Sequence, residues 1–135
     1  MTTVLFACVQ NAGRSQIAAA LFNQLVNPSK ARALSAGTAP GERVHPEVAD
    51  AMREVGLDLG GNVPTRLTDE LAQAASVLVT MGCGDACPIF PDQRYLDWEL
   101  TDPAGKSVDE VRPIVDDIDA RVRALLAELL GEAVA

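Results

Sequence analysis

A cysteine and an arginine close to the start of the chain have the types and spacing of a nucleophile and an anion-binding partner. Cys8 is followed, after five residues, by Arg14 and then by Ser15. A guanidinium group is planar and permanently charged, so it binds two oxygens of a tetrahedral oxyanion at once. A cysteine thiolate is a strong nucleophile, and a nearby hydroxyl can stabilise it by a hydrogen bond. The spacing therefore predicts that Cys8 attacks an oxyanion held by Arg14.

The loop that carries these residues is predicted to lead from a strand into a helix. The apolar run 4–7 indicates a short buried strand, and residues 15–25 have the pattern of a helix. Such a turn directs successive backbone N–H groups and the positive end of the helix dipole into one concavity, which favours both an oxyanion and a thiolate. A buried structural cysteine is the alternative, and it leaves this polar loop unexplained. The expected substrate-binding residues are Val9, Gln10, Asn11, Ala12, Gly13 and Arg14.

The rest of the chain alternates between predicted strands and helices. The further strands are expected at residues 31–36, 76–81 and 94–98, and the further helices at 46–55, at 68–74 and from Ser107 onward. Ser107 and Glu110 have the spacing of a capping box, and Pro113 is expected to kink or weaken the first turn of the last helix. The alternation predicts an α/β fold with an open parallel sheet and with ligands at the carboxyl ends of the strands.

Three features are expected to meet at that edge of the sheet. They are the Cys8 loop after the first strand, the pair Cys83 and Cys87 after the third, and Asp102 after the fourth. The two later cysteines could form a redox relay with Cys8, be non-essential thiols, or belong to a metal site. A zinc site needs about four ligands, and with His45 as the only histidine the supply of ligands is small.

Four other side chains have two interpretations each. Asp102 has the position of a general acid, but before a proline it could also be a turn residue that caps its own backbone. His45 precedes Pro46 at an expected helix start, which favours a capping role over that of a base. Tyr95 and Trp98 could form a wall of the pocket, although a strand near the sheet edge would place at least one of them in the core.

The composition excludes several classes of function. The 135 residues are expected to form one domain, 1–135, and a net charge of −8 argues against nucleic acid as a partner. No apolar run approaches the ~20 residues that cross a membrane, and the first residues lack the pattern of a signal peptide. Three cysteines are an odd number and do not form a disulfide framework, which predicts a reducing, cytoplasmic location.

These motifs resemble the low-molecular-weight tyrosine phosphatase fold and, within it, the thiol-dependent arsenate reductases. The similar segments are 8–16, 35–38, 44–46, 54–58, Trp98 and 102–105. The resemblance implies a four-stranded parallel sheet flanked by helices. It also implies Cys8 as the nucleophile, Arg14 and the loop amides as the oxyanion site, Ser15 as the group that stabilises the thiolate, Asn11 as the residue that holds the loop, and Asp102 as the general acid.

The spacing of the later cysteines resembles one branch of these reductases. Thioredoxin-coupled enzymes place two further cysteines around a longer segment, whereas Cys83 and Cys87 are four residues apart. The segment is closer to the branch that passes arsenic to mycothiol, from which mycoredoxin releases arsenite. Mycothiol is then a co-substrate, and no cofactor is bound. Ala19 stands where some relatives have an acidic residue for potassium, so no metal is predicted.

The expected function is therefore the reduction of arsenate to arsenite in arsenic detoxification. The alternatives are a thioredoxin-coupled reductase with a Cys8, Cys83 and Cys87 relay, a phosphotyrosine phosphatase, and a non-enzymatic module that binds oxyanions or senses oxidants. Aromatic residues make up only 4% of the chain, which leaves few side chains to hold a phenol ring. Two spare thiols also have no role in a phosphatase, and both points favour a reductase.

Overall fold

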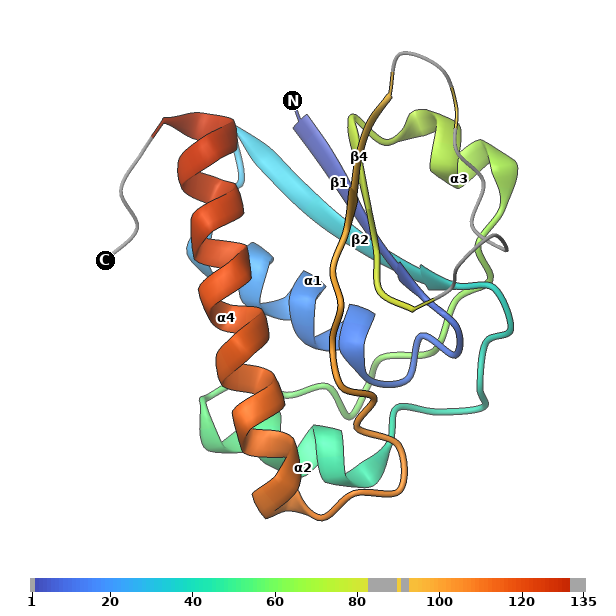
Figure 1. Ribbon diagram of the computed structural model, residues 1–135, viewed down its shortest axis with the longest axis vertical. Coiled ribbons are helices and arrows are strands. Elements are labelled where there is room, and N and C mark those ends of the chain that lie inside the picture. Colours follow the sequence, from blue (N-terminus) through green and yellow to red (C-terminus); the bar gives the residue numbers. More distant parts are fainter. Residues whose placement is uncertain (1, 83–89, 91–92, 132–135) are drawn as a thin grey trace.

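The computed structural model describes residues 2–82, 90 and 93–131 and shows a parallel sheet with helices on both faces (Figure 1). The strands are β1 (Thr2–Cys8), β2 (Ala31–Gly37), β3 (Val77–Thr80) and β4 (Arg94–Asp97), and their order in the sheet is β2-β1-β3-β4. Every neighbouring pair is parallel, which confirms the predicted α/β fold with its four-stranded sheet. The helices are α1 (Arg14–Leu25), α2 (Pro46–Glu54), α3 (Asp69–Ala74) and α4 (Val108–Leu130).

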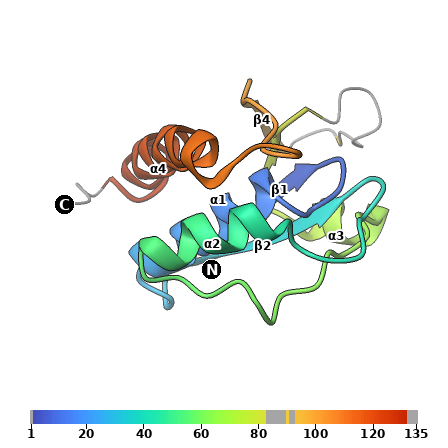
Figure 2. The same ribbon diagram turned by 90° about the horizontal axis from the view of Figure 1, so that it is seen from below.

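The central strand β1 is buried on both faces of the sheet. Val4, Phe6 and Cys8 face the larger core, which α1, α2 and α4 complete, and Leu5 and Ala7 face a smaller core under α3. Both ribbon views place α4 on one side of the strands and α3 on the other (Figure 2). A strand covered on both faces needs the continuous apolar sequence that the chain has there.

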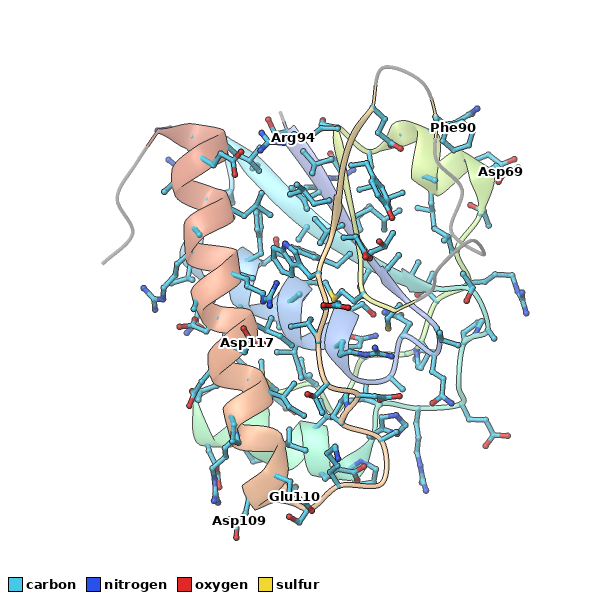
Figure 3. The ribbon with its side chains drawn as sticks, viewed as in Figure 1. Asp69, Phe90, Arg94, Asp109, Glu110 and Asp117 are labelled. Carbon is cyan, nitrogen blue, oxygen red and sulfur yellow. The ribbon has the colours of Figure 1, made fainter. Side chains whose placement is uncertain are left out.

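Aromatic and edge contacts fix the positions of the outer elements. The ring of Phe6 lies 5.6 Å from that of Trp98, between centroids, so Trp98 belongs to the core, and it does not line the pocket at Cys8. Phe90 packs against the smaller core beside α3, and Arg94 of β4 forms an ion pair with Glu128 of α4 (Figure 3). Phe90 and Arg94 thus contact the helical layers on opposite faces of the sheet.

The last helix begins and ends as its sequence predicts. Ser107 and Glu110 form a capping box, and the hydrogen bonds from Ser107 hold the pKa of Glu110 below its ordinary value. Gly131 ends the helix with a φ of 67°, which favours glycine. Helix α4 continues through Pro113, and buried side chains of the following turns pack on the core. The expected kink or weakening at Pro113 stays a prediction.

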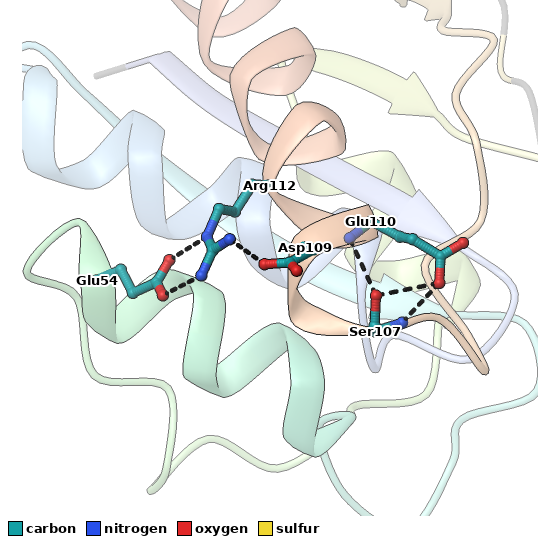
Figure 4. Close-up of polar contacts among 5 residues, drawn as sticks. All are labelled: Glu54, Ser107, Asp109, Glu110 and Arg112. Carbon is teal, nitrogen blue, oxygen red and sulfur yellow. Dashed lines mark hydrogen bonds and ion pairs between the residues drawn. The ribbon is translucent and has the colours of Figure 1, made fainter.

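An ion pair at the protein surface joins α2 to α4 (Figure 4). Arg112 Nε donates to Glu54 Oε1 at 2.7 Å and Arg112 Nη2 to Oε2 at 2.8 Å, while Nη1 pairs with Asp109. These hydrogen bonds from the guanidinium hold the pKa of Glu54 below its ordinary value. The pair therefore favours the ionised carboxylate in the folded state.

We expect this pair to make part of the stability dependent on pH. Its contribution is present above the ordinary glutamate pKa of about 4.5 and is lost as the pH falls through the lowered pKa of Glu54. The free energy of unfolding, measured with urea over a series of pH values, should therefore fall more steeply in acid for the wild type than for Glu54→Gln. The difference should be small because both groups are exposed. Parallel curves would show that the pair adds nothing.

Candidate active site

The end of β1 and the start of α1 enclose a small pocket. Cys8 is the last residue of β1 and is only 2% exposed, and α1 begins six residues later at Arg14. The pocket has a volume of about 150 Å³, and its lining residues are Cys8, Val9, Gln10, Ala12, Gly13, Arg14, His45 and Asp102. The structure therefore brings most of the predicted site residues together, from elements that are distant in the sequence.

The carbonyl groups of the Cys8 loop point away from the pocket. Those of Cys8, Val9, Gln10 and Ala12 accept backbone hydrogen bonds from the segment 38–45, at N–O distances from 2.8 to 3.2 Å. Within the part of the chain that the structure describes, no backbone N–H from residue 9 to residue 14 donates to another protein group. Gly37, the last residue of β2, lets this strand lie close to the Cys8 loop, because a Cβ there would lie 2.5 Å from the carbonyl oxygen of Val9. The loop thus presents unpaired amides to an anion.

Behind the loop, Asn11 and Ser15 are fully buried, and their hydrogen bonds position the sulfur of Cys8. The backbone N–H of Thr65 donates to Asn11 Oδ1 at 2.9 Å, which fixes the orientation of that amide. Asn11 Nδ2 therefore donates to Ser15 Oγ at 2.6 Å. The Ser15 hydroxyl keeps its own hydrogen for Cys8 Sγ, 2.9 Å away. A hydrogen bond that the sulfur accepts stabilises negative charge on it.

Arg14 and Asp102 face each other across the pocket mouth. Arg14 Nη2 lies 3.6 Å from Asp102 Oδ2, and the two side chains are 11% and 59% exposed. The other carboxylate oxygen, Oδ1, accepts a hydrogen bond from the N–H of Ala104 at 3.0 Å. Both interpretations of Asp102 are thus present in one geometry, because one oxygen caps the turn and the other reaches the pocket.

Comparison with known proteins gives the family. The family model of the low molecular weight phosphotyrosine protein phosphatases matches residues 3–134. This chain belongs to that family. Its similar relatives include arsenate reductase 1 of Staphylococcus epidermidis, which is 33% identical over 89% of this chain and 92% of the relative.

Two solved structures extend the similarity. A thioredoxin-dependent arsenate reductase of Corynebacterium glutamicum is 39% identical with a TM-score of 0.81, and the match covers 98% of this chain. This chain spans only 63% of that longer protein. An arsenate reductase of Archaeoglobus fulgidus is 32% identical with a TM-score of 0.78, and the match covers 92% of this chain and 98% of the other.

Gly82, two residues after the end of β3, lets the Arg14 side chain lie against its backbone. Its φ is 88°, and a Cβ there would lie 2.5 Å from Arg14 Nη1. We expect Gly82→Ala to displace the guanidinium and weaken binding of phosphate or arsenate by about ten- to a hundredfold, as for the loss of a charged hydrogen bond. Calorimetric titration with phosphate measures this. Gly56→Ala is the matched control, since Gly56 has a φ of 87° and open space around it. Equal affinities in the two variants would contradict this role of Gly82.

The structure corrects the expectation for His45. It occupies the N-cap position of α2, but its side chain makes no capping hydrogen bond. Its ring lines the pocket instead, and Cδ2 lies 3.5 Å from the point that a Cβ of Gly13 would occupy. The histidine is thus a wall of the pocket, placed there because its backbone N–H donates to the loop carbonyl of Ala12.

Other predicted features lie outside this pocket. Thr80 Oγ1 gives its hydrogen to Asp97, so the Tyr95 hydroxyl donates to Thr80 Oγ1 at 3.0 Å, and Tyr95 does not line the pocket. Cys83 and Cys87 lie outside the described residues. Within residues 2–82, 90 and 93–131, no three metal-ligating side chains gather in one place, and no helix is long and apolar enough to cross a membrane. The prediction that no metal is bound stays a prediction.

Two polar residues behind the loop were not predicted from the sequence. Gln16 and Asn62 belong to the same hydrogen-bond network as Asn11, and Gln16 is only 4% exposed. A glutamine among the apolar residues of the first helix was the available signal, because a buried amide needs polar partners.

Proposed function

We propose that this chain reduces arsenate to arsenite through an adduct on Cys8. The observation that carries the proposal is the pocket itself. It combines a buried sulfur, loop amides that donate to no described protein group, and Arg14, and none of its described lining residues is a phenylalanine, tyrosine or tryptophan. Such a pocket suits a free tetrahedral oxyanion better than an aryl ester, and the similarity to arsenate reductases of 30% identity and more supports this choice.

In the proposed first step, the loop amides and Arg14 bind the arsenate oxygens and the Cys8 thiolate attacks arsenic. Asp102 transfers a proton to the departing hydroxyl, which leaves as water. The product is a covalent arsenic(V) adduct on sulfur. No electron has moved between arsenic and the protein at this stage.

For the reducing steps we propose a small thiol, mycothiol, as co-substrate in a cytoplasmic setting. Its thiolate attacks arsenic and displaces Cys8, so that arsenic(V) is carried on the mycothiol sulfur. A mycoredoxin thiolate then attacks that sulfur. The arsenic–sulfur bond breaks with its electron pair left on arsenic, which departs as arsenite, and the two sulfurs form a disulfide. The short separation of Cys83 and Cys87 in the sequence supports an external thiol.

A thioredoxin-coupled relay is the second candidate. It is favoured by the 39% identity to a thioredoxin-dependent arsenate reductase. In this scheme Cys83 attacks the sulfur of Cys8, arsenic leaves with the electron pair, and Cys87 resolves the disulfide before thioredoxin reduces it. Both schemes are chemically complete, and they differ in the thiols that reduce arsenic. An assay with each reductant therefore distinguishes them.

The deciding experiment measures arsenite release with mycothiol plus mycoredoxin, with thioredoxin plus its reductase, and with glutathione plus glutaredoxin. We expect turnover in the first system and expect the Cys83→Ser, Cys87→Ser double variant to retain it. Turnover only with thioredoxin, lost in the double variant, would establish the relay instead. Hydrolysis of an aryl phosphate without arsenate turnover would establish a phosphatase.

A further inference from the structure

A buried carboxamide connects the Cys8 loop to the segment between α2 and α3. Gln16 lies in the first turn of α1, and its Nε2 donates to both the backbone oxygen and Oδ1 of Asn11, each at 3.1 Å. Its Oε1 accepts from Asn62 Nδ2 at 3.1 Å. Gln16 does not line the pocket, so any effect on the reacting atoms passes through Asn11.

The direction of each hydrogen bond in this network is fixed. A backbone carbonyl only accepts, so the Gln16 atom next to the backbone oxygen of Asn11 is the nitrogen, and the Gln16 oxygen faces Asn62. Donation therefore proceeds in one direction, from Asn62 to Gln16, to Asn11, to Ser15 and finally to Cys8. Hydrogen bonds aligned in this way polarise one another in a buried setting.

We propose that Gln16 is a positioning residue for Cys8, and that Asn62 links it to the segment before α3. Gln16 holds Asn11 in its left-handed conformation, with φ of 51°, and keeps the Asn11 amide directed at Ser15. Without it, both Asn11 oxygens lose a donor, and the hydrogen bond from Ser15 to the sulfur weakens. The inference rests on the proposed function for its importance, but the thiolate that it concerns can be measured without arsenate.

The charged and titratable groups that face Cys8 are separate from this network. Among the described residues that line its pocket they are Arg14, His45 and Asp102. Gln16 contacts none of them in the hydrogen bonds of the structure, so a substitution there changes the donor network and leaves these groups in place.

The test uses the Cys83→Ser, Cys87→Ser background, in which Cys8 is the only thiol. Gln16→Met preserves the length of the side chain and removes its polar atoms. We expect the rate of alkylation of Cys8 by iodoacetamide at neutral pH to fall about three- to tenfold, and the rate–pH curve to move to higher pH with the same plateau. Asn62→Ala should move the curve in the same direction by less.

Asn23→Leu is the matched control on the same helix. Its amide also makes two hydrogen bonds, with the backbone of Ala33 at 3.0 and 2.8 Å, but outside the network. It should lower the unfolding temperature and leave the alkylation curve unchanged. An unchanged curve in Gln16→Met overturns the proposal, and if that variant fails to fold, an unchanged curve in Asn62→Ala overturns it. A shifted curve in an enzyme that does not reduce arsenate supports this inference and contradicts only the proposed function.

Discussion

Cys8→Ser is expected to remove arsenite formation entirely, to below about a hundredth of the wild-type rate. A serine hydroxyl stays protonated at neutral pH and supplies no comparable nucleophile, while the loop amides and Arg14 remain in place. The replacement is small, and a serine Oγ can take the place of the sulfur next to Ser15. The measurement is arsenite release with each of the three thiol systems.

The control for this variant separates binding from chemistry. Phosphate should still bind, because the pocket contacts are made by Arg14 and by backbone N–H groups that do not depend on the thiol. The unfolding temperature should stay close to that of the wild type. Turnover above about a hundredth of the wild-type rate would mean that another group is the nucleophile.

Asp102→Asn is expected to slow turnover by roughly 10²–10⁴ and to leave oxyanion affinity nearly unchanged, since this is the usual contribution of a positioned acid. Asparagine is suited to the question because its Oδ1 can still accept the hydrogen bond from Ala104 that caps the turn. The atom that faces Arg14 changes from a carboxylate oxygen to an amide nitrogen. The variant thus removes the proton donor and preserves the turn.

Asp97→Asn is the matched control for this prediction. Asp97 ends β4 and accepts a hydrogen bond from Thr80 Oγ1 at 2.7 Å, and it does not line the pocket. It should change the rate little. If Asp102→Asn is as active as Asp97→Asn, Asp102 is only a turn residue.

The parts of the site that could be predicted from the sequence are those encoded locally. The strand, loop and helix around Cys8 follow one another within a few residues, and the parallel topology brings Asp102 to the same edge of the sheet. The hydrogen-bond donors behind the Cys8 loop could not be predicted in this way. Asn62 and Thr65 reach Gln16 and Asn11 across 46 and 54 residues, and no local periodicity indicates such a contact.

His45 is a residue whose role could be predicted only in part from the sequence. Its position before Pro46 predicts the N-cap of α2 correctly, because that depends on neighbouring residues alone. Its ring lies at the pocket because its backbone N–H donates to the loop carbonyl of Ala12, and that contact joins segments distant in the sequence. Local sequence therefore predicts the backbone role of this residue and not its side-chain role.

The backbone around Cys8 and the backbone around Asp102 should differ in how readily they unfold locally, because β1 lies inside the sheet and β4 at its edge. Cys8 ends a strand that is paired on both sides and buried on both faces, so we expect its backbone to open less often than that of an edge strand. Asp102 follows the edge strand β4, whose residues are mostly exposed. Amide exchange should accordingly be slowest in β1 and faster around Asp102. Under mildly destabilising conditions, the Cys8 loop should therefore stay folded after the segment that carries the proton donor Asp102 has opened.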